Sequence, residues 1–174
     1  MRNLPVSSIA SVLVFLVAAA IRAENHPSTE ENARVTLCVT KFRSIMQEEG
    51  MGFVNATTAL APHAAVTLVS RSGMPTLLVR RATKIEIEIT AADASVSYRP
   101  LAVYFRPKLN GAKPRIDVDG KINFAHWVSP KGTLVIHDKY IHAGPDFNWE
   151  FFVIIQRVSD GEIGIVDPEI VNEN

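Results

Sequence analysis

The stretch from Asn148 to Val166 (NWEFFVIIQRVSDGEIGIV) constrains the fold of this chain most strongly. It begins with a nearly unbroken run of aromatic and β-branched residues, 149–155, which is typical of a strand buried on both faces. Asp160-Gly161 then favours a tight two-residue turn, because such a turn needs positive φ angles. The sequence therefore predicts a central β-hairpin. Asp167-Pro168 should end its regular pairing, since proline cannot donate to a strand ladder.

The same turn predicts a register for this hairpin. Closure at Asp160-Gly161 pairs Val158 with Ile163, and Ile155 with Val166. Both pairs are apolar, so the predicted register agrees with a strand that is buried on both faces.

Short strand patterns recur along the rest of the chain, separated by turn residues about every ten positions. The clearest is Lys84 to Thr90 (KIEIEIT), in which isoleucines and glutamates alternate as in a strand with one solvated face. The other patterns cover residues 66–70, 76–80, 101–105, 115–124 and 134–136. We therefore expect a mainly β fold, an antiparallel two-sheet β-sandwich that is immunoglobulin-like or similar.

The segment 29–49 carries conflicting signals. Ser28 and Glu31 have capping-box spacing, and apolar residues from Val35 to Met46 fall at helical intervals. The β-branched run VTLCVT favours a strand instead. We expect a helix across 29–49 that packs against the sandwich, with a strand followed by a short helix as the alternative. An α+β roll, with this helix laid across one curled sheet, is the alternative fold.

The first residues have the pattern of a secretory signal peptide. Arg2 precedes a short apolar run, 12–20, and Ala23 can occupy a small-residue cleavage site. We expect residues 1–23 to be removed and 24–174 to form a single β-rich domain, secreted or periplasmic, with no transmembrane segment. An uncleaved N-terminal anchor is the alternative. The cleaved chain would hold 16 basic and 18 acidic residues.

The chain has one cysteine, Cys38, so no intrachain disulfide can hold the exported domain together. Its neighbours Val35, Leu37 and Val39 are apolar. This context favours a buried, unreactive thiol over a nucleophile or an interchain disulfide.

Three histidines, His126, His137 and His142, form the grouping that most indicates metal chemistry. Imidazole is the commonest protein ligand for zinc and copper, and Asp138 could orient one of the rings. Their spacing matches no metal motif. A metal-binding protein or metal-dependent enzyme is therefore kept as an alternative function, and we expect no bound metal or cofactor.

Charge is unevenly distributed along the chain. Five basic residues and no acids lie between 94 and 116, and five acids and no bases follow Ser159. One interpretation is an anion-binding surface that uses Arg99, Arg106 and Lys108 in the basic 99–115 segment. The other is that the basic and acidic regions neutralise each other, which the formal net charge of zero favours.

The sequence contains no Gly-x-Ser-x-Gly, phosphate-binding loop, His-Glu-x-x-His or Cys-x-x-Cys motif. We therefore expect a non-catalytic binding or structural module, with the metal and anionic-polymer hypotheses as alternatives. The residues indicate no specific nucleic-acid partner and do not identify a ligand.

Overall fold

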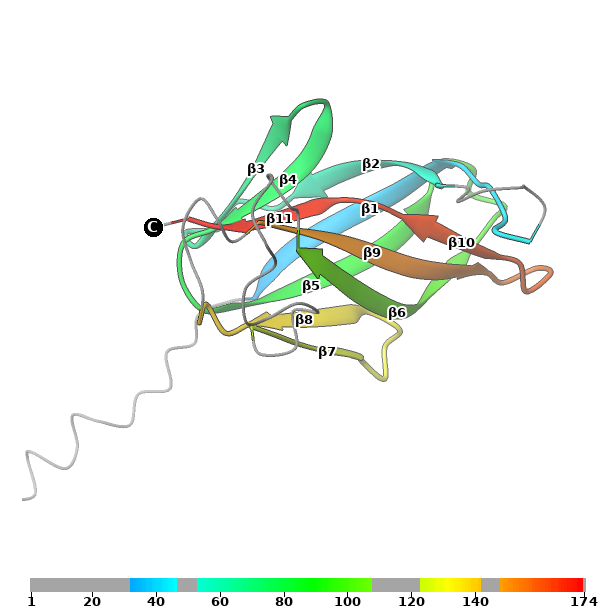
Figure 1. Cartoon of the computed structure of the whole chain (residues 1–174). Coiled ribbons are helices and arrows are strands. Elements are labelled where there is room, and N and C mark those ends of the chain that lie inside the picture. The colour runs from blue at the N-terminus through cyan, green and yellow to red at the C-terminus, as the bar shows by residue number, and fades with distance from the viewer. Residues whose placement is uncertain (1–31, 47–52, 108–122, 142–147, 174) are drawn as a thin grey trace, which may run out of the picture. The chain divides into compact units, whose positions relative to one another are not determined.

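Eleven β-strands and no helix make up the regular structure of the residues that this computed structural model describes, which are 32–46, 53–107, 123–141 and 148–173. The fold is mainly β, as predicted, and its strands form two mixed sheets (Figure 1). The proposed signal segment and most of the predicted hairpin at 115–124 lie outside the described residues. Residues 32–174 form one compact unit.

The first sheet contains five strands. Their order across the sheet is β2 (Asn55–Leu60), β1 (Ala33–Lys41), β5 (Thr83–Ala91), β8 (Leu134–Asp138) and β7 (Phe124–Val128). β1 and β5 run parallel, and the other neighbours pair antiparallel.

The second sheet is built around β9 (Asn148–Arg157). The strand β6 (Tyr98–Pro107) pairs along the whole of β9, while β10 (Ile163–Val166) and β11 (Glu169–Asn172) pair with successive parts of it. β11 then pairs in parallel with β4 (Met74–Val79), which pairs with β3 (Val66–Arg71). Each sheet is therefore mixed, and the predicted purely antiparallel arrangement is wrong.

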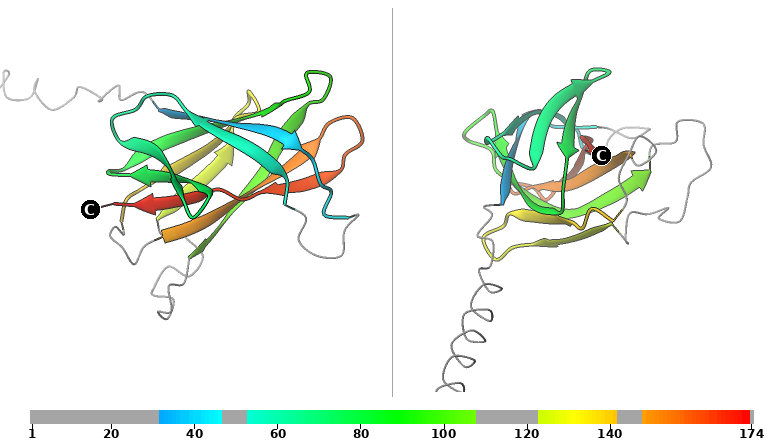
Figure 2. Two further views of the ribbon diagram at one scale, coloured as in Figure 1. Left: turned by 90° about the horizontal axis from the view of Figure 1, so that it is seen from above. Right: turned by 90° about the vertical axis from the view of Figure 1, so that its left-hand side faces the viewer.

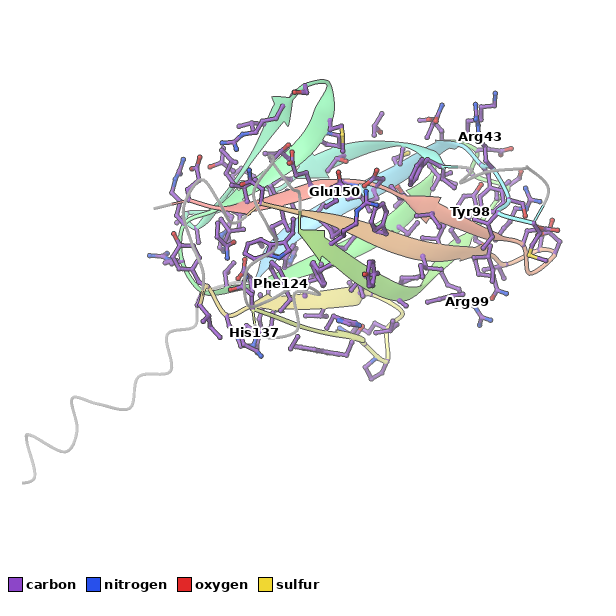
Figure 3. All side chains as sticks on the ribbon, viewed as in Figure 1. Arg43, Tyr98, Arg99, Phe124, His137 and Glu150 are labelled. Carbon is purple, nitrogen blue, oxygen red and sulfur yellow. The ribbon has the colours of Figure 1, made fainter. Side chains whose placement is uncertain are left out.

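The two sheets (Figure 2) contribute residues to one hydrophobic core. Both sheets contribute large apolar side chains that are almost inaccessible to water, because alternate residues of each strand point inward. They meet at Phe124 of β7, whose ring stacks on Phe105 at 4.2 Å between centroids and contacts the edge of Trp149 at 5.1 Å. Figure 3 shows Phe124 between the two layers.

The expected helix at 29–49 is wrong over Ala33–Lys41, where the chain forms β1. Every second residue of β1 up to Val39 is buried, as expected of a strand and not of a helix: Ala33, Val35, Leu37 and Val39. β1 lies between β2 and β5, and pairing on both edges satisfies its backbone. The β-branched residues indicated this outcome, and tertiary pairing decided it.

The central hairpin is present, but its register differs from the prediction. Ile163 pairs with Gln156 and Val166 with Val153, a shift of two residues. The Arg157 N–H donates to the carbonyl of Glu162 at 2.8 Å, so the turn holds four residues rather than two. Because strand faces alternate with period two, a shift of two leaves every side chain on its predicted face.

A buried polar network holds the ends of three strands together. Asp138, at the end of β8, is fully buried. Its Oδ1 accepts hydrogen bonds from the Asn123 side chain (3.1 Å), the Asn172 side chain (3.2 Å) and the Tyr140 backbone (2.8 Å). Burial raises the pKa of Asp138 from 3.8 to about 6, although these three hydrogen bonds oppose the rise.

We expect Val153→Asp or Ile155→Asp to abolish cooperative folding. Both side chains are fully buried, and an isolated buried carboxylate costs several kcal/mol, against about 5–15 kcal/mol for the stability of a whole domain. The matched control is Ile154→Asp, because Ile154 is only partly buried and lies on the other face of the same strand. Thermal unfolding should show a cooperative transition for Ile154→Asp alone. Cooperative melting of all three variants would show that β9 is not central.

A second prediction concerns pH. Because the pKa of Asp138 is raised in the fold, the folded protein keeps a proton that the unfolded chain loses between about pH 4 and 6. The free energy of unfolding should therefore fall as pH rises through this window, by at most about 3 kcal/mol. Asp138→Asn cannot ionise and should lack this fall. Urea unfolding of both proteins between pH 4 and 7 measures the difference.

Asp160→Asn is the control, because Asp160 should change the stability with pH in the opposite direction to Asp138. Hydrogen bonding to Arg157 lowers the pKa of Asp160, so its contribution to stability is present at neutral pH and is lost as pH falls. An equal pH dependence in the wild type and in Asp138→Asn would contradict a role for the buried carboxyl group.

Candidate ligand-binding surface

A β-bulge in β6 brings two of the predicted anion-binding residues onto one face. Arg99 pairs with Gln156 and Arg106 with Glu150, and the register shifts between Pro100 and Ala102. In a regular strand, residues seven positions apart point to opposite faces. The extra residue restores the phase, so Arg99 and Arg106 both project from the outer face of the second sheet. Lys108 lies outside the described residues.

Aromatic rings gather on this same outer face around Phe152. Its ring stacks on Tyr104 of β6 at 6.3 Å and on Phe53 at 6.1 Å between centroids. Phe53 reaches this position because its backbone forms a parallel bridge with Ile165 of β10. Phe152 is nearly covered, whereas Tyr104 is 52% exposed. An accessible aromatic ring therefore rests on a buried one.

Arg106 is fixed beside these rings. Its Nε donates to Glu150 Oε2 at 2.9 Å, its Nη2 donates to the same oxygen, and its guanidinium carbon lies 5.1 Å from the centre of the Phe152 ring. The hydrogen bonds to Glu150 raise the pKa of Arg106 above its ordinary value, so it stays charged. We call Phe53, Tyr104, Arg106, Glu150 and Phe152 the Phe152 platform.

The basic residues on this face are already engaged by neighbours on β9. Arg99 Nε donates to Gln156 Oε1 at 2.8 Å, at the far end of the strand pair from Glu150 (Figure 3). The carboxylate that neutralises Arg106 comes from β9, not from the acidic C-terminal region. Two of those acids pair elsewhere: Asp160 with Arg157, and Glu173 with both Arg71 and Arg80.

Two of the three histidines of the alternative metal site lie in the described strands β7 and β8. In the β7–β8 pair, Ala125 lies opposite His137 and Ile136 lies opposite His126. Because directly opposed residues share a face, His126 and His137 belong to opposite faces of the sheet. His142 lies outside the described residues. Within those ranges no three His, Cys, Asp or Glu side chains group in a way that could hold a metal ion.

Cys38 lies in β1, where it pairs with Thr57 on one side and Thr90 on the other. Its thiol is partly buried, so it is less enclosed than the sequence predicts. Its neighbours Leu37 and Val39 point into the core instead, which places Cys38 on the outer face of the first sheet.

A pocket of about 220 Å³ adjoins the Phe152 platform. It lies where β2, the edge strand of the first sheet, faces β4 and the junction between β10 and β11 in the second. Phe53 belongs to both the pocket and the platform. The lining residues are mostly apolar: Phe53, Val54, Ala56, Thr58, Met74, Pro75, Val166, Asp167 and Pro168.

Sequence reasoning identified Arg99 and Arg106, together with the aromatic residues interleaved with them, but missed Phe53, Glu150 and Phe152. Two short patterns, Tyr104-x-Arg106 on β6 and Glu150-x-Phe152 on β9, each place an aromatic and a charged residue on one face of their strand. These patterns become adjacent only when β6 and β9 are known to pair in this register. Phe53 could not be found in this way, because its bridge to Ile165 joins distant parts of the chain.

Comparison of the chain with models of known protein families found no match, and comparison with curated proteins found no similar sequence.

Proposed function

We propose that this chain is an exported, non-catalytic β-sandwich module that binds a ligand through the Phe152 platform. The two mixed sheets that share one core support the sandwich architecture. Paired strands are rigid supports, so side chains on their outer face are held in fixed positions. The function is then recognition by a preformed surface.

The observation that carries this proposal is the half-exposed Tyr104 ring stacked on the nearly buried Phe152. An aromatic side chain offers a large contact area at low conformational cost, and tyrosine and arginine are enriched at binding hot spots. Arg106 is already ordered by Glu150 and by the Phe152 ring. A ligand would therefore meet a surface that loses little freedom on binding.

The pairing of Arg106 favours this function over the binding of an anionic polymer. An anion would compete with the Glu150 carboxylate for the same guanidinium, and Glu150 is held opposite Arg106 by the strand register. The side chain of Glu150 is also mostly covered, which strengthens its attraction for the arginine. We expect affinity for the platform to depend on its rings more than on its charge.

Export is proposed on the signal-peptide pattern of residues 1–23. No helix in the described ranges has the length and hydropathy needed to span a bilayer.

We expect the mature protein to begin near Glu24. The apolar run at 12–20 is shorter than the ~20 residues that a membrane-spanning helix requires, and Ala23 supplies a small residue for cleavage. The intact mass of the protein recovered from the periplasm or the medium tests this. A mass that still includes residues 1–23 would indicate an N-terminal anchor.

The platform is tested by binding to an array of purified neutral polysaccharides, anionic polysaccharides and short peptides near physiological ionic strength. We expect at least one neutral polysaccharide or peptide to bind the wild type. Tyr104→Ala should weaken that binding by roughly tenfold or more, because hot-spot residues contribute ~2 kcal/mol or more. Ile141→Ala is the matched control, since Ile141 is equally exposed but lies just after β8, away from the platform.

Three outcomes would count against the platform. Binding that Tyr104→Ala and Arg106→Ala leave unchanged would place the ligand elsewhere, and an array without any platform-dependent binding would contradict the proposal. Salt-sensitive retention on heparin that is lost in Arg99→Ala and Arg106→Ala would favour the anionic-polymer hypothesis instead.

A further inference from the structure

The strand β7 lies at one edge of the first sheet, and within the described ranges β8 is its only strand partner (Figure 1). Its sequence, FAHWV, contains no Lys, Arg, Asp, Glu or Pro. The edge strand β6 of the second sheet differs, because it carries Pro100, Pro107, two arginines and a bulge. Charges, prolines and bulges keep edge strands from pairing with another chain, and β7 lacks all three.

The backbone of β7 has a defined phase relative to its open edge. At one end of the β7–β8 ladder, the Ser129 N–H donates to the Thr133 carbonyl at 2.8 Å. At the other end, the Lys139 N–H donates to the Asn123 carbonyl at 2.8 Å. Hydrogen-bonded pairs alternate with non-hydrogen-bonded pairs in an antiparallel ladder. The N–H and C=O groups of three β7 residues therefore point away from β8: Phe124, His126 and Val128.

These three residues match those of a second copy around a two-fold axis at His126. In an antiparallel pair of β7 strands with this centre, Phe124 lies opposite Val128, and His126 lies opposite itself. Each opposed pair then exchanges both of its backbone hydrogen bonds. A centre at Ala125 or Trp127 would leave one of the three residues without a match in the strand. The centre at His126 is therefore the register that uses the whole strand.

The outer-face side chains of β7 are complementary to themselves in this register. Trp127 of one copy lies opposite Ala125 of the other, in the kind of pair that brings side chains closest together. Trp127 is 43% exposed, and its neighbour across the ladder, Val135, is buried. The indole ring can thus extend from Val135 over the small Ala125 of the second copy. The two-fold axis repeats this contact on its other side.

The middle of β7 is accessible to a second strand. The side chain of His126 belongs to the same face as the buried Phe124, yet it is exposed, as are Trp127 and Val128. Because β7 carries no lysine, arginine or carboxylate, no fixed like charges would oppose each other across the axis. The strand therefore presents open backbone groups, exposed apolar side chains and no repulsive element to a copy of itself.

We propose that two copies of this chain associate through β7, in an antiparallel pair that joins their first sheets into one continuous sheet. A strand of five residues provides a small interface, so the dimer is weak and forms at high protein concentration. This inference does not depend on the proposed function, because the Phe152 platform lies on the outer face of the other sheet.

Charge substitutions at position 126 test the pair by sedimentation velocity over a range of protein concentrations. His126→Glu and His126→Lys should each raise the dimer dissociation constant by about fivefold or more, because each variant places two like charges opposite one another. An equimolar mixture of the two variants should restore association, since the pair then joins opposite charges. Thr57→Glu is the matched control, because Thr57 is also exposed but lies on β2, at the opposite edge of the same sheet.

Tryptophan fluorescence reports the same contact. The chain has two tryptophans, and Trp149 is buried in the core. The emission of the wild type should move to shorter wavelength as its concentration rises, because the partner strand covers Trp127. His126→Glu should lack this shift over the same range. Trp127→Phe should lack the shift and still associate, since phenylalanine keeps an aromatic ring against Ala125.

A wild type that stays monomeric would overturn the inference and leave the β7 edge to a different kind of partner. A dimer that His126→Glu leaves intact, a dimer that Thr57→Glu weakens equally, or a mixture that fails to associate would also overturn it. Thermal melts check that each variant folds. If a variant at position 126 does not fold, the concentration dependence of wild-type emission decides the matter. Tyr104→Ala on the ligand array judges the proposed function separately.

Discussion

The fold depends on the pairing of β9 along both of its edges. β6 covers one edge, and β10 and β11 cover successive parts of the other. Pairing on both sides satisfies the backbone of a strand with a long apolar run, 151–155, which could not otherwise be buried. Its inward residues, such as Phe151 and Val153, then form the centre of the core. Its outward residues, Glu150 and Phe152, become the base of the platform.

The same strand therefore supports both the core and the proposed binding platform. Bulges often occur where a side chain must be redirected, and the bulge in β6 puts Arg99, Tyr104 and Arg106 in phase on the outer face. The core limits how far these residues can move, because Phe105 lies between Tyr104 and Arg106 and stacks on Phe124 inside. A platform built on a packed core has little freedom to move.

Asp138 is a buried polar residue that joins strand ends through hydrogen bonds. Its carboxyl group is costly to ionise, but it accepts hydrogen bonds from segments that come from both sheets. Replacement by apolar residues would remove the cost and also the directional bonds that align the β8 and β11 ends. The protein thus keeps a buried carboxyl group whose raised pKa should make its stability depend on pH between about 4 and 6.

Local sequence determined the strand character of most of the chain, because alternation and β-branched content act over a few residues. It predicted the hairpin, the faces of its side chains, and strands such as β5 and β8. It did not determine the edges along which strands pair, so β1 was misassigned, β11 was missed and the parallel pairs were unforeseen. Those depend on contacts between distant segments. The platform likewise could not be predicted from local sequence, because Phe53, Arg106 and Phe152 meet only through tertiary pairing.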